Sequence, residues 1–198
     1  MFDLYQNYLK ENYFYLVKDK NVLEIAPLDG RQTWVILDQN PLSLTLVEAD
    51  HSMVTKLTEQ FPSVDVVYED IFKYFTKKYS YDVVVCCGLL YHLHSPLYLL
   101  ELIVNQANPE YLILDSANCP NDIVIYDDEE TNVLGNFQAI NEWKTCNLRT
   151  IAHYNTIKKA LTNLGYTELS FDNNVERFSS DQIYKKNFWM ATWKKETA

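Results

Sequence analysis

The stretch YDVVVCC, residues 81–87, constrains the fold of this chain more than any other feature. It is a short apolar run bounded by polar residues, and its apolar and polar positions do not alternate. Such a run is typical of a strand in a parallel sheet that is covered on both faces. Parallel strands need crossover connections, usually helices. The chain must therefore supply helical segments before and after this strand.

Four further apolar runs accompany it, with helical patterns between them. The predicted strands are NVLEIA (21–26), LSLTLVEA (42–49), VDVVYED (64–70) and EYLILDSA (110–117). Helices are predicted over 3–17, 31–40, 51–61, 71–79 and 95–107, the last with Ser95 as its N-cap. Strands that alternate with helices predict an α/β fold, a doubly wound, mostly parallel, Rossmann-like sheet with helices on both faces.

The pattern changes after residue 117. Residues 118–150 are polar and irregular, too long for a simple connection, and we interpret 118–154 as an insertion or lid over a substrate. A helix is predicted over 155–166, capped by Asn155 or Thr156 and ended at Gly165. Two further strands are predicted over 167–172 and 187–194, and we expect them to form an antiparallel pair. Because the sequence shows no repeat and no linker, we expect one domain over 1–198. Its parts are a cofactor-binding core (1–117), the insertion or lid (118–154) and a C-terminal helix with strands (155–198).

Charge and cysteine content argue against some classes of partner. The formal net charge of −10 repels phosphate backbones and argues against a large nucleic-acid footprint, although it leaves room for a local basic groove. No run of about eighteen apolar residues is present, so we expect no membrane span. The N-terminus lacks the layout of a secretory signal. The four cysteines form no CxxC pair, and we interpret them as free thiols in a reducing cytoplasm.

Polar residues stand where the predicted strands end. In open α/β sheets, ligands bind beyond the carboxyl ends of the strands. The turn APLDG (26–30) follows the first strand, Glu48 ends the second, Asp70 ends the third and Gly88 follows the fourth. Glu48 lies about twenty residues past the turn, where a ribose-binding carboxylate belongs. The turn lacks the G-x-G-x-x-G spacing of a dinucleotide site, which argues against a dehydrogenase.

Together these stretches resemble the class I S-adenosylmethionine-dependent methyltransferases, over roughly residues 20–117 and more weakly beyond. The matching pieces are VLEIAPLDG, LVEAD, EDIF and YDVVVCCGLLYHLHSPLYLLELI, the last similar to small-molecule methyltransferases and to tRNA wobble-uridine-modifying relatives. The resemblance implies S-adenosyl-L-methionine as the cofactor. It departs from the family at position 26, commonly glycine and here Ala26, followed by Pro27 and Leu28.

The resemblance also implies the cofactor-binding residues. These are Glu24, Ala26, Pro27, Gly30, Glu48, Asp70, Ile71, Cys87 and Gly88. Glu48 would bind the ribose hydroxyls, and Asp70 would accept from the adenine amino group while Ile71 packs on the ring. For Glu24 and Asp70, the alternative interpretation is an ordinary helix-capping carboxylate.

Chemistry at the cofactor's methyl group points to the residues after the fourth strand. A methyl group on a sulfonium is already electrophilic, so the protein must align a nucleophile and, where needed, remove a proton. Tyr91 and His92 are the candidate catalytic residues, His92 as general base because its ordinary pKa lies near neutrality. The candidate substrate-binding residues are His94, Trp143 and Tyr154. No metal site is predicted, because His92 and His94 lack a third ligand at useful spacing.

The leading hypothesis is a cytoplasmic methyltransferase acting on a small molecule, or on a modest polar group of a larger one. Three alternatives stay open. The glycine-poor turn suggests a non-catalytic cofactor-binding or partner subunit. The fold also suits an enzyme that consumes S-adenosylmethionine without methylating a substrate. The wobble-uridine resemblance suggests an RNA methyltransferase. The sequence names neither the acceptor nor the oligomeric state.

Overall fold

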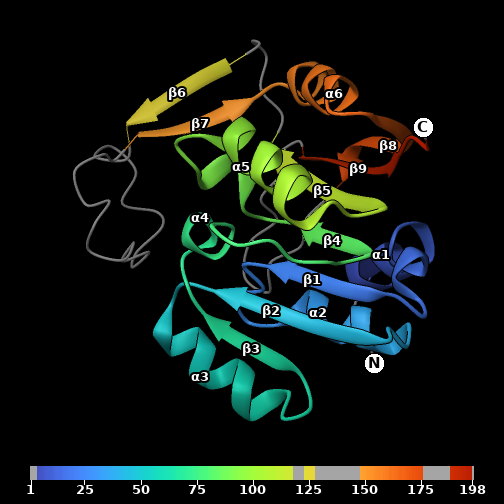
Figure 1. Ribbon diagram of the computed structural model, residues 1–198, viewed down its shortest axis with the longest axis vertical. Helices are drawn as coiled ribbons and strands as arrows, with labels where there is room; N and C mark the ends of the chain where they lie inside the picture. Colours follow the sequence, from blue (N-terminus) through green and yellow to red (C-terminus); the bar gives the residue numbers. More distant parts are fainter. Residues whose placement is uncertain (1–3, 118–122, 128–147, 176–187, 198) are drawn as a thin grey trace.

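A seven-stranded sheet organises the computed structural model, which describes residues 4–117, 123–127, 148–175 and 188–197. The strand order is β3-β2-β1-β4-β5-β9-β8 (Figure 1). The parallel strands are β1 (Asn21–Ile25), β2 (Ser43–Glu48), β3 (Asp65–Tyr68), β4 (Val83–Cys86) and β5 (Tyr111–Ala117). The antiparallel strands are β8 (Tyr166–Val175) and β9 (Phe188–Lys195). The predicted doubly wound sheet and its antiparallel C-terminal pair are confirmed.

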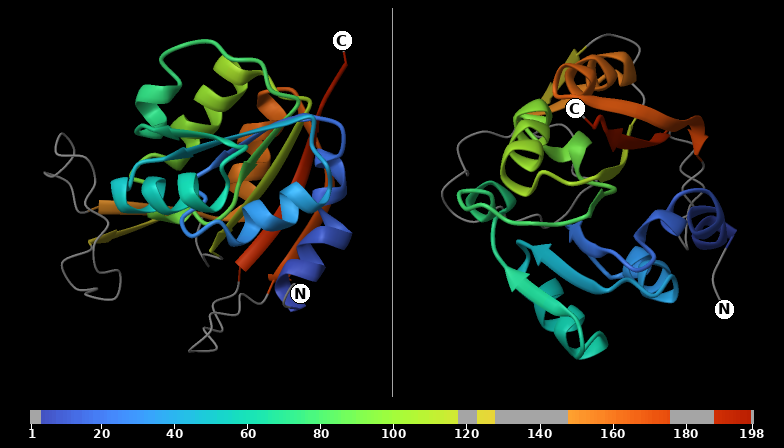
Figure 2. Two further views of the ribbon diagram at one scale, coloured as in Figure 1. Left: turned by 90° about the horizontal axis from the view of Figure 1, so that it is seen from below. Right: turned by 45° about the vertical axis from the view of Figure 1, so that its right-hand side comes forward.

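Helices cover both faces of this sheet. One layer holds α1 (Leu4–Asn12), α2 (Arg31–Asp38) and α3 (His51–Gln60), and the other holds α4 (Ile71–Tyr74), α5 (Pro96–Leu102) and α6 (Tyr154–Asn163). The left panel of Figure 2 shows the sheet between the two layers. Side chains alternate between the layers, so Val22 packs with α1–α3 and Leu23 with α4–α6. Every residue of β4 is buried, as the apolar run 81–87 predicts.

Three predicted helices differ from the observed ones. The helix predicted over 3–17 ends at Asn12, and a separate 3₁₀ turn, η1 (Phe14–Val17), follows it. The helix predicted over 71–79 is the single turn α4. The helix predicted over 95–107 is α-helical only in α5, and the π-helical segment η3 (Ile103–Ala107) continues it. This segment ends at Asn108, whose φ is +50°. Pro109 disfavours helical geometry at the residue before it, which explains this end.

Three further predictions, on two helix caps and on the stretch 118–150, are corrected by the structure. The prediction of Asn155 or Thr156 as the cap of α6 is wrong, because the cap is His153, whose Nδ1 accepts from the Asn155 N–H at 3.1 Å. Ser95 begins α5 without a side-chain cap bond. The stretch 118–150 is not irregular throughout, since β6 (Ile123–Asp127) and β7 (Leu148–Ala152) pair antiparallel. Gly165 follows α6 with a φ of +83°, as predicted.

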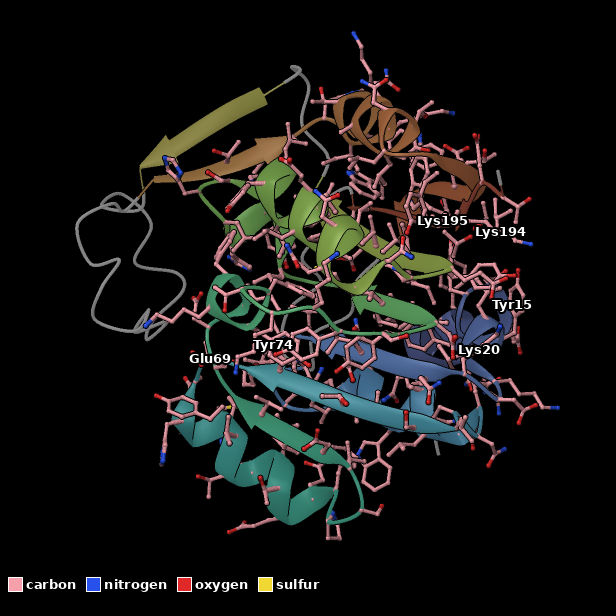
Figure 3. The ribbon with its side chains drawn as sticks, in the orientation of Figure 1. Tyr15, Lys20, Glu69, Tyr74, Lys194 and Lys195 are labelled. Atoms are coloured by element: carbon pink, nitrogen blue, oxygen red, sulfur yellow. The ribbon has the colours of Figure 1, made fainter. Side chains whose placement is uncertain are left out.

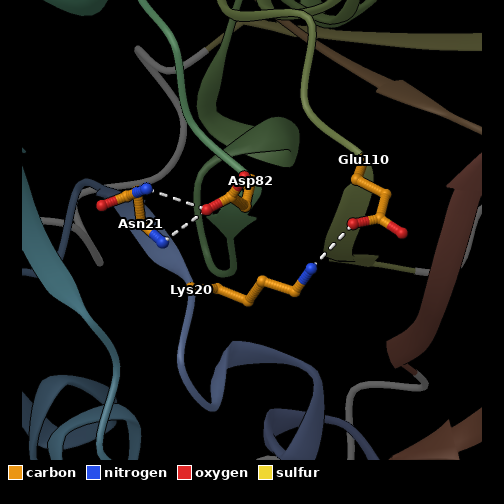
Figure 4. Close-up of polar contacts among 4 residues, drawn as sticks. All are labelled: Lys20, Asn21, Asp82 and Glu110. Atoms are coloured by element: carbon orange, nitrogen blue, oxygen red, sulfur yellow. Dashed lines mark hydrogen bonds and ion pairs between the residues drawn. The ribbon is translucent and has the colours of Figure 1, made fainter.

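Polar clamps hold the amino ends of the central strands in place (Figure 4). The main-chain N–H and the Nδ2 of Asn21 donate to Oδ2 of Asp82 at 2.8 and 3.0 Å, which ties β1 to the start of β4. Lys20 pairs with Glu110, just before β5, at 2.8 Å. These contacts help set the strand register, and the register decides which residues meet at the carboxyl ends. Among the helices that the structure describes, none is long and apolar enough to cross a membrane.

Candidate cofactor site

The turn after β1 has an unusual backbone. Ala26, Leu28 and Gly30 all lie in the left-handed region, with φ angles of +54°, +54° and +76°. For an L-residue other than glycine this conformation costs about 1–2 kcal/mol. Strain of this kind persists only where the surrounding structure imposes it, and it concentrates at functional sites. Two of the three left-handed positions of this turn therefore carry side chains, in a conformation that favours glycine.

Gly30 is required on steric grounds as well. A Cβ atom at this position would lie 2.5 Å from Cε2 of Phe61 and 3.1 Å from Cδ2 of Leu57. Its N–H donates to the carbonyl of Pro27 at 2.9 Å, which closes the turn, and its own carbonyl accepts the N–H of Trp34 in α2 at 3.2 Å. Gly30 therefore joins the turn directly to the start of α2.

Glu48, at the carboxyl end of β2, contacts this turn. Its Oε2 accepts the main-chain N–H of Leu28 at 3.1 Å, and its Oε1 accepts those of Ala49 and Asp50 at 2.8 and 2.9 Å. The side chain is 5% exposed. A carboxylate has about four lone-pair sites, and three are used here. One site remains for an incoming hydroxyl, which fits the predicted ribose role.

Glu24 lies within β1, not after it, and its side chain is buried beneath α2. The hydroxyl of Thr33 donates to its Oε2 at 2.7 Å. Its Oε1 has no hydrogen-bond partner among the described residues. Burial raises the pKa of Glu24 to about 8, the Thr33 hydrogen bond opposes this, and the nearby acids Glu48 and Asp29 raise it further. Glu24 is therefore a buried acid under the turn, not a helix cap.

At the end of β3, Asp70 takes the helix-capping position that the sequence left as an alternative. Its Oδ1 accepts the N–H groups of Phe72 and Lys73 at 2.9 and 3.3 Å. Ile71, the first residue of α4, is buried in the core. Contacts of these two residues with an adenine ring stay a prediction.

A residue missed by the sequence reasoning lies at the end of β5. Asp115 is fully buried, and its Oδ1 accepts the N–H of Gly88 at 2.6 Å. Gly88 has a φ of +94° and begins the turn that leads from β4 to Tyr91 and His92. Cys87, also buried, directs its thiol to the carbonyl of Ile113 at 3.9 Å. The signal for Asp115 was available, because it is a carboxylate at the carboxyl end of a predicted strand, like Glu48.

Tyr91 and His92 lie in the 3₁₀ turn η2 (Leu90–His92), with ring centroids 4.2 Å apart. Tyr91 also packs edge-on against Phe188 of β9, at 5.4 Å. His94 is exposed, and its Nδ1 is 2.9 Å from the hydroxyl of Ser95.

Strand β7 contacts the chain directly after η2. The main-chain N–H of Thr150 donates to the carbonyl of Leu93 at 2.8 Å, and its hydroxyl donates to the carbonyl of His94 at 2.7 Å. The end of the predicted lid therefore lies next to the candidate catalytic residues.

Helix α1 adds polar groups that the sequence reasoning also missed. Tyr8 donates a hydrogen bond to Asp172 of β8, and its hydroxyl lies 3.2 Å from that of Tyr13. Tyr13 is buried among the residues of the α1–α3 layer, which include Cys87, and burial raises its pKa. Tyr13 also interacts electrostatically with Cys87, which follows β4, so Tyr13 lies near the carboxyl end of that strand.

Tyr154, one of the predicted substrate residues, is packed in the core. Tyr154 is 6% exposed and stacks on Phe171, with ring centroids 3.7 Å apart, and it also packs edge-on against Trp189 at 5.3 Å. Its described contacts are those of a core residue. Trp143 lies outside the described residues, so its role stays a prediction.

Two other features differ in their relation to this edge: the first borders it at Glu69, whose N–H donates to the carbonyl of Glu48 at 3.1 Å, and the second lies at the opposite end of the sheet. A hollow of about 600 Å³ beside β3 is lined by Glu69 and by Tyr74 and further tyrosines (Figure 3). Lys20 and Lys194 lie 5.7 and 5.6 Å from the ring centroid of Tyr111, at the amino ends of the parallel strands. Within the described ranges, no three His, Cys, Asp or Glu side chains converge so that they could hold a metal ion.

Solved structures on which this chain superposes include methyltransferases and a domain crystallised with SAH. The chain superposes on the N-terminal domain of EvdMO1, crystallised with SAH and D-fucose, with a TM-score of 0.68 and 15% identity, over 98% of this chain and 83% of that one. It superposes on the N-methyltransferase NodS from Bradyrhizobium japonicum WM9 with a TM-score of 0.65 and 15% identity, over 98% and 97%. It superposes on magnesium protoporphyrin IX methyltransferase from Synechocystis PCC 6803, with bound SAM, with a TM-score of 0.64 and 12% identity. The match covers 96% of this chain and 79% of that one.

Sequence comparison adds one partial match. A stretch of 59 residues is 36% identical to ribosomal RNA small subunit methyltransferase A of Maridesulfovibrio salexigens, which is 30% of this chain and 22% of that protein. The chain thus matches about a fifth of the length of this relative, and no protein-family model matches it. The strand order and the superpositions agree with the resemblance seen in the sequence. The chain has the fold of the class I S-adenosylmethionine-dependent methyltransferases.

Proposed function

We propose that this protein is an S-adenosylmethionine-dependent methyltransferase that acts on a small molecule or on a modest polar group of a larger one. The observation that carries the proposal is the contact of the turn after β1 with Glu48, through the Leu28 N–H at 3.1 Å. It joins a left-handed loop and a buried carboxylate at one edge of the sheet. The fold shared with structures that contain SAH or SAM supports the same cofactor here.

The residues present fit this cofactor. Glu48 keeps one lone-pair site for a ribose hydroxyl, and the turn at Ala26–Gly30 would face the methionine part of the cofactor. Asp70 and Ile71 border the adenine side, and Cys87 with Gly88 border the sulfur side. When bound, S-adenosylmethionine supplies an electrophilic methyl group. The protein therefore has to bind and orient the methyl-accepting substrate and to exclude water.

On the side of the methyl-accepting substrate, His92 takes a proton from the nucleophile of that substrate. Tyr91 orients the substrate. Both belong to the short turn η2, which follows Gly88, and Asp115 holds Gly88 through its N–H. Strand β7 bonds to the carbonyls of Leu93 and His94, and this supports a role for the 118–154 segment as a cover over the acceptor.

Cofactor binding is the first test. Isothermal titration calorimetry with S-adenosylmethionine and with S-adenosylhomocysteine is expected to give binding heat, and NADH is expected to give none. E48A should weaken binding at least tenfold, because a ribose hydroxyl loses its acceptor and the Leu28 N–H loses the bond that holds the turn, whereas E59A on the exposed face of α3 should bind normally. Absence of heat with both adenosyl compounds refutes the proposal.

Methyl transfer needs a separate test with candidate acceptors. Release of S-adenosylhomocysteine is measured with panels of amines, phenols, carboxylic acids and short RNA hairpins, each against protein and cofactor alone. We expect turnover in a small-molecule panel. Turnover without any acceptor, with cofactor fragments found by mass spectrometry, would instead identify an enzyme that consumes the cofactor without methylating.

Two further candidate functions rest on specific observations. The 59-residue match to a ribosomal RNA methyltransferase favours an RNA acceptor. Against it, the cluster of Lys20 and Lys194 lies at the end of the sheet opposite the turn. Leu28, 45% exposed at a left-handed position, favours a cofactor-binding subunit without turnover, because its side chain projects from the loop that must approach the ligand. Binding with no turnover in any panel would support that function.

A further inference from the structure

Glu24 is a buried acid, and no cation among the described residues compensates its charge. It is 1% exposed and lies between two apolar neighbours in the sheet, Leu46 of β2 and Val85 of β4. The Thr33 hydroxyl binds Oε2, and Oε1 has no hydrogen-bond partner within the described part of the chain. An ionised carboxylate in such surroundings is costly, and a group of this kind takes up a proton instead.

The charged groups that act on Glu24 increase this cost. They are Glu48 at the end of β2 and Asp29 in the turn, both acidic. Arg31, which begins α2, is engaged by Asp29 at 2.9 Å. From α2, the group that faces Glu24 is the neutral hydroxyl of Thr33. The described part of the chain therefore offers this carboxyl two like charges and one hydrogen bond.

We propose that Glu24 is a neutral carboxylic acid in the free protein and that binding of S-adenosylmethionine releases its proton to solvent. This inference rests on the proposed function. S-adenosylmethionine carries a sulfonium and an ammonium against one carboxylate, a net charge of +1. Placed on the turn above β1, that charge stabilises the ionised form of an acid directly below it. One O–H bond at Glu24 breaks, the electron pair stays on the carboxylate, and buffer takes the proton.

The linkage makes cofactor affinity depend on pH. Below the pKa of Glu24, about 8, binding has to remove the proton, so the affinity rises with pH up to that value and then levels off. S-adenosylhomocysteine lacks the sulfonium charge and is neutral overall, so it should release less of the proton. The site would therefore distinguish cofactor from product more strongly in alkaline than in acidic solution.

Calorimetry in two buffers counts the protons. Binding of S-adenosylmethionine at pH 7 is measured in phosphate and in Tris, which differ widely in ionisation enthalpy. For the wild type with S-adenosylmethionine, the difference in observed heat should correspond to close to one proton released per site. With S-adenosylhomocysteine the wild type should release less. Glu24→Gln should release close to none with S-adenosylmethionine. The matched control, Glu59→Gln on exposed α3, should behave as the wild type. Equal proton release in wild type and Glu24→Gln overturns the proposal.

A second measurement tests the free protein without any ligand. In ¹³C-glutamate-labelled protein, the carboxyl resonance that is absent from Glu24→Gln should titrate with a midpoint near 8, far above the other glutamates. Thr33→Val removes the hydrogen bond that favours the ionised form, so it should raise this midpoint and serves as the second variant. A midpoint near 4.5 overturns the inference. Absence of binding heat with a midpoint near 8 would instead refute the proposed function and leave Glu24 protonated.

Discussion

Oδ1 of Asp115 lies 2.6 Å from the main-chain nitrogen of Gly88, and this one hydrogen bond joins the end of β5 to the turn that carries Tyr91 and His92. The acceptor is fully buried and comes from the strand next to β4 in the sheet. The position of η2 therefore depends on a residue 27 positions further along the chain.

Asp115→Ala should destabilise the protein and displace this turn. The Gly88 N–H loses its buried partner, which costs about 1–3 kcal/mol. Urea unfolding followed by circular dichroism measures the loss. Asp115→Asn keeps an acceptor oxygen in the same place and should lose clearly less. If both variants lose the same amount, the charge of Asp115 matters and the hydrogen bond to Gly88 does not.

Gly30→Ala should be among the most destabilising glycine substitutions in this chain. The new methyl group would lie 2.5 Å from Phe61, and the backbone φ is +76°. Crowding and left-handed strain together predict a loss of about 2–4 kcal/mol. Gly165→Ala is the matched control, since its φ of +83° is similar but no atom lies within 4 Å of the added Cβ. It should lose about 1–2 kcal/mol, and equal losses in thermal unfolding would show that crowding contributes nothing.

Ala26→Gly should relieve strain in the turn. Ala26 has a φ of +54°, which glycine adopts without penalty. The gain of about 1–2 kcal/mol is partly offset by about 0.4–1 kcal/mol of added freedom in the unfolded chain. A net gain of up to about 1.6 kcal/mol is expected in chemical denaturation, together with equal or tighter binding of S-adenosylhomocysteine. A clear loss of stability would mean that the methyl group of Ala26 contributes packing that outweighs the strain.

Glu24 should make the stability of the wild type fall as pH rises. The folded protein keeps the Glu24 proton up to a pKa of about 8, whereas the unfolded chain releases it near 4.5. The folded state therefore binds more protons between these values, and its free energy of unfolding decreases there by at most about 1.4 kcal/mol per pH unit.

The comparison of wild type with Glu24→Gln isolates this effect. Glutamine does not titrate, so the variant should gain stability relative to the wild type from about pH 5 to pH 8, with no further relative change at higher pH. Urea unfolding at four pH values measures the difference. A constant difference over this range would show that Glu24 ionises alike in the folded and unfolded states.

Much of the fold could be predicted from the sequence because it depends on local patterns. The apolar run at 81–87 and its neighbours led to the parallel strands, and the polar residues after them led to Glu48 and to the turn at 26–30. Helix ends were harder to predict. The cap of α6 is the ring of His153, a residue type for which capping preferences gave no signal, and α5 changes to π geometry before Asn108.

The candidate site required contacts between distant residues. The sequence indicated that Glu24 and Asp70 were acids near strand ends, and only the fold put Glu24 beneath Thr33 and made Asp70 the cap of α4. Asp115 reaches Gly88 because β5 lies beside β4. Tyr8 reaches Asp172, 164 positions away, because β8 lies at the sheet edge near α1.

The sequence by itself determined the order of strands and helices, and with it the class of fold, because the spacing of apolar residues along a segment sets which face it can bury. The tertiary structure decided which acids are neutral, which are hydrogen-bonded and which meet at one edge. Those properties follow from neighbours brought together across the sheet and from the solvent that they exclude, and neither is encoded in the spacing of residues along one segment.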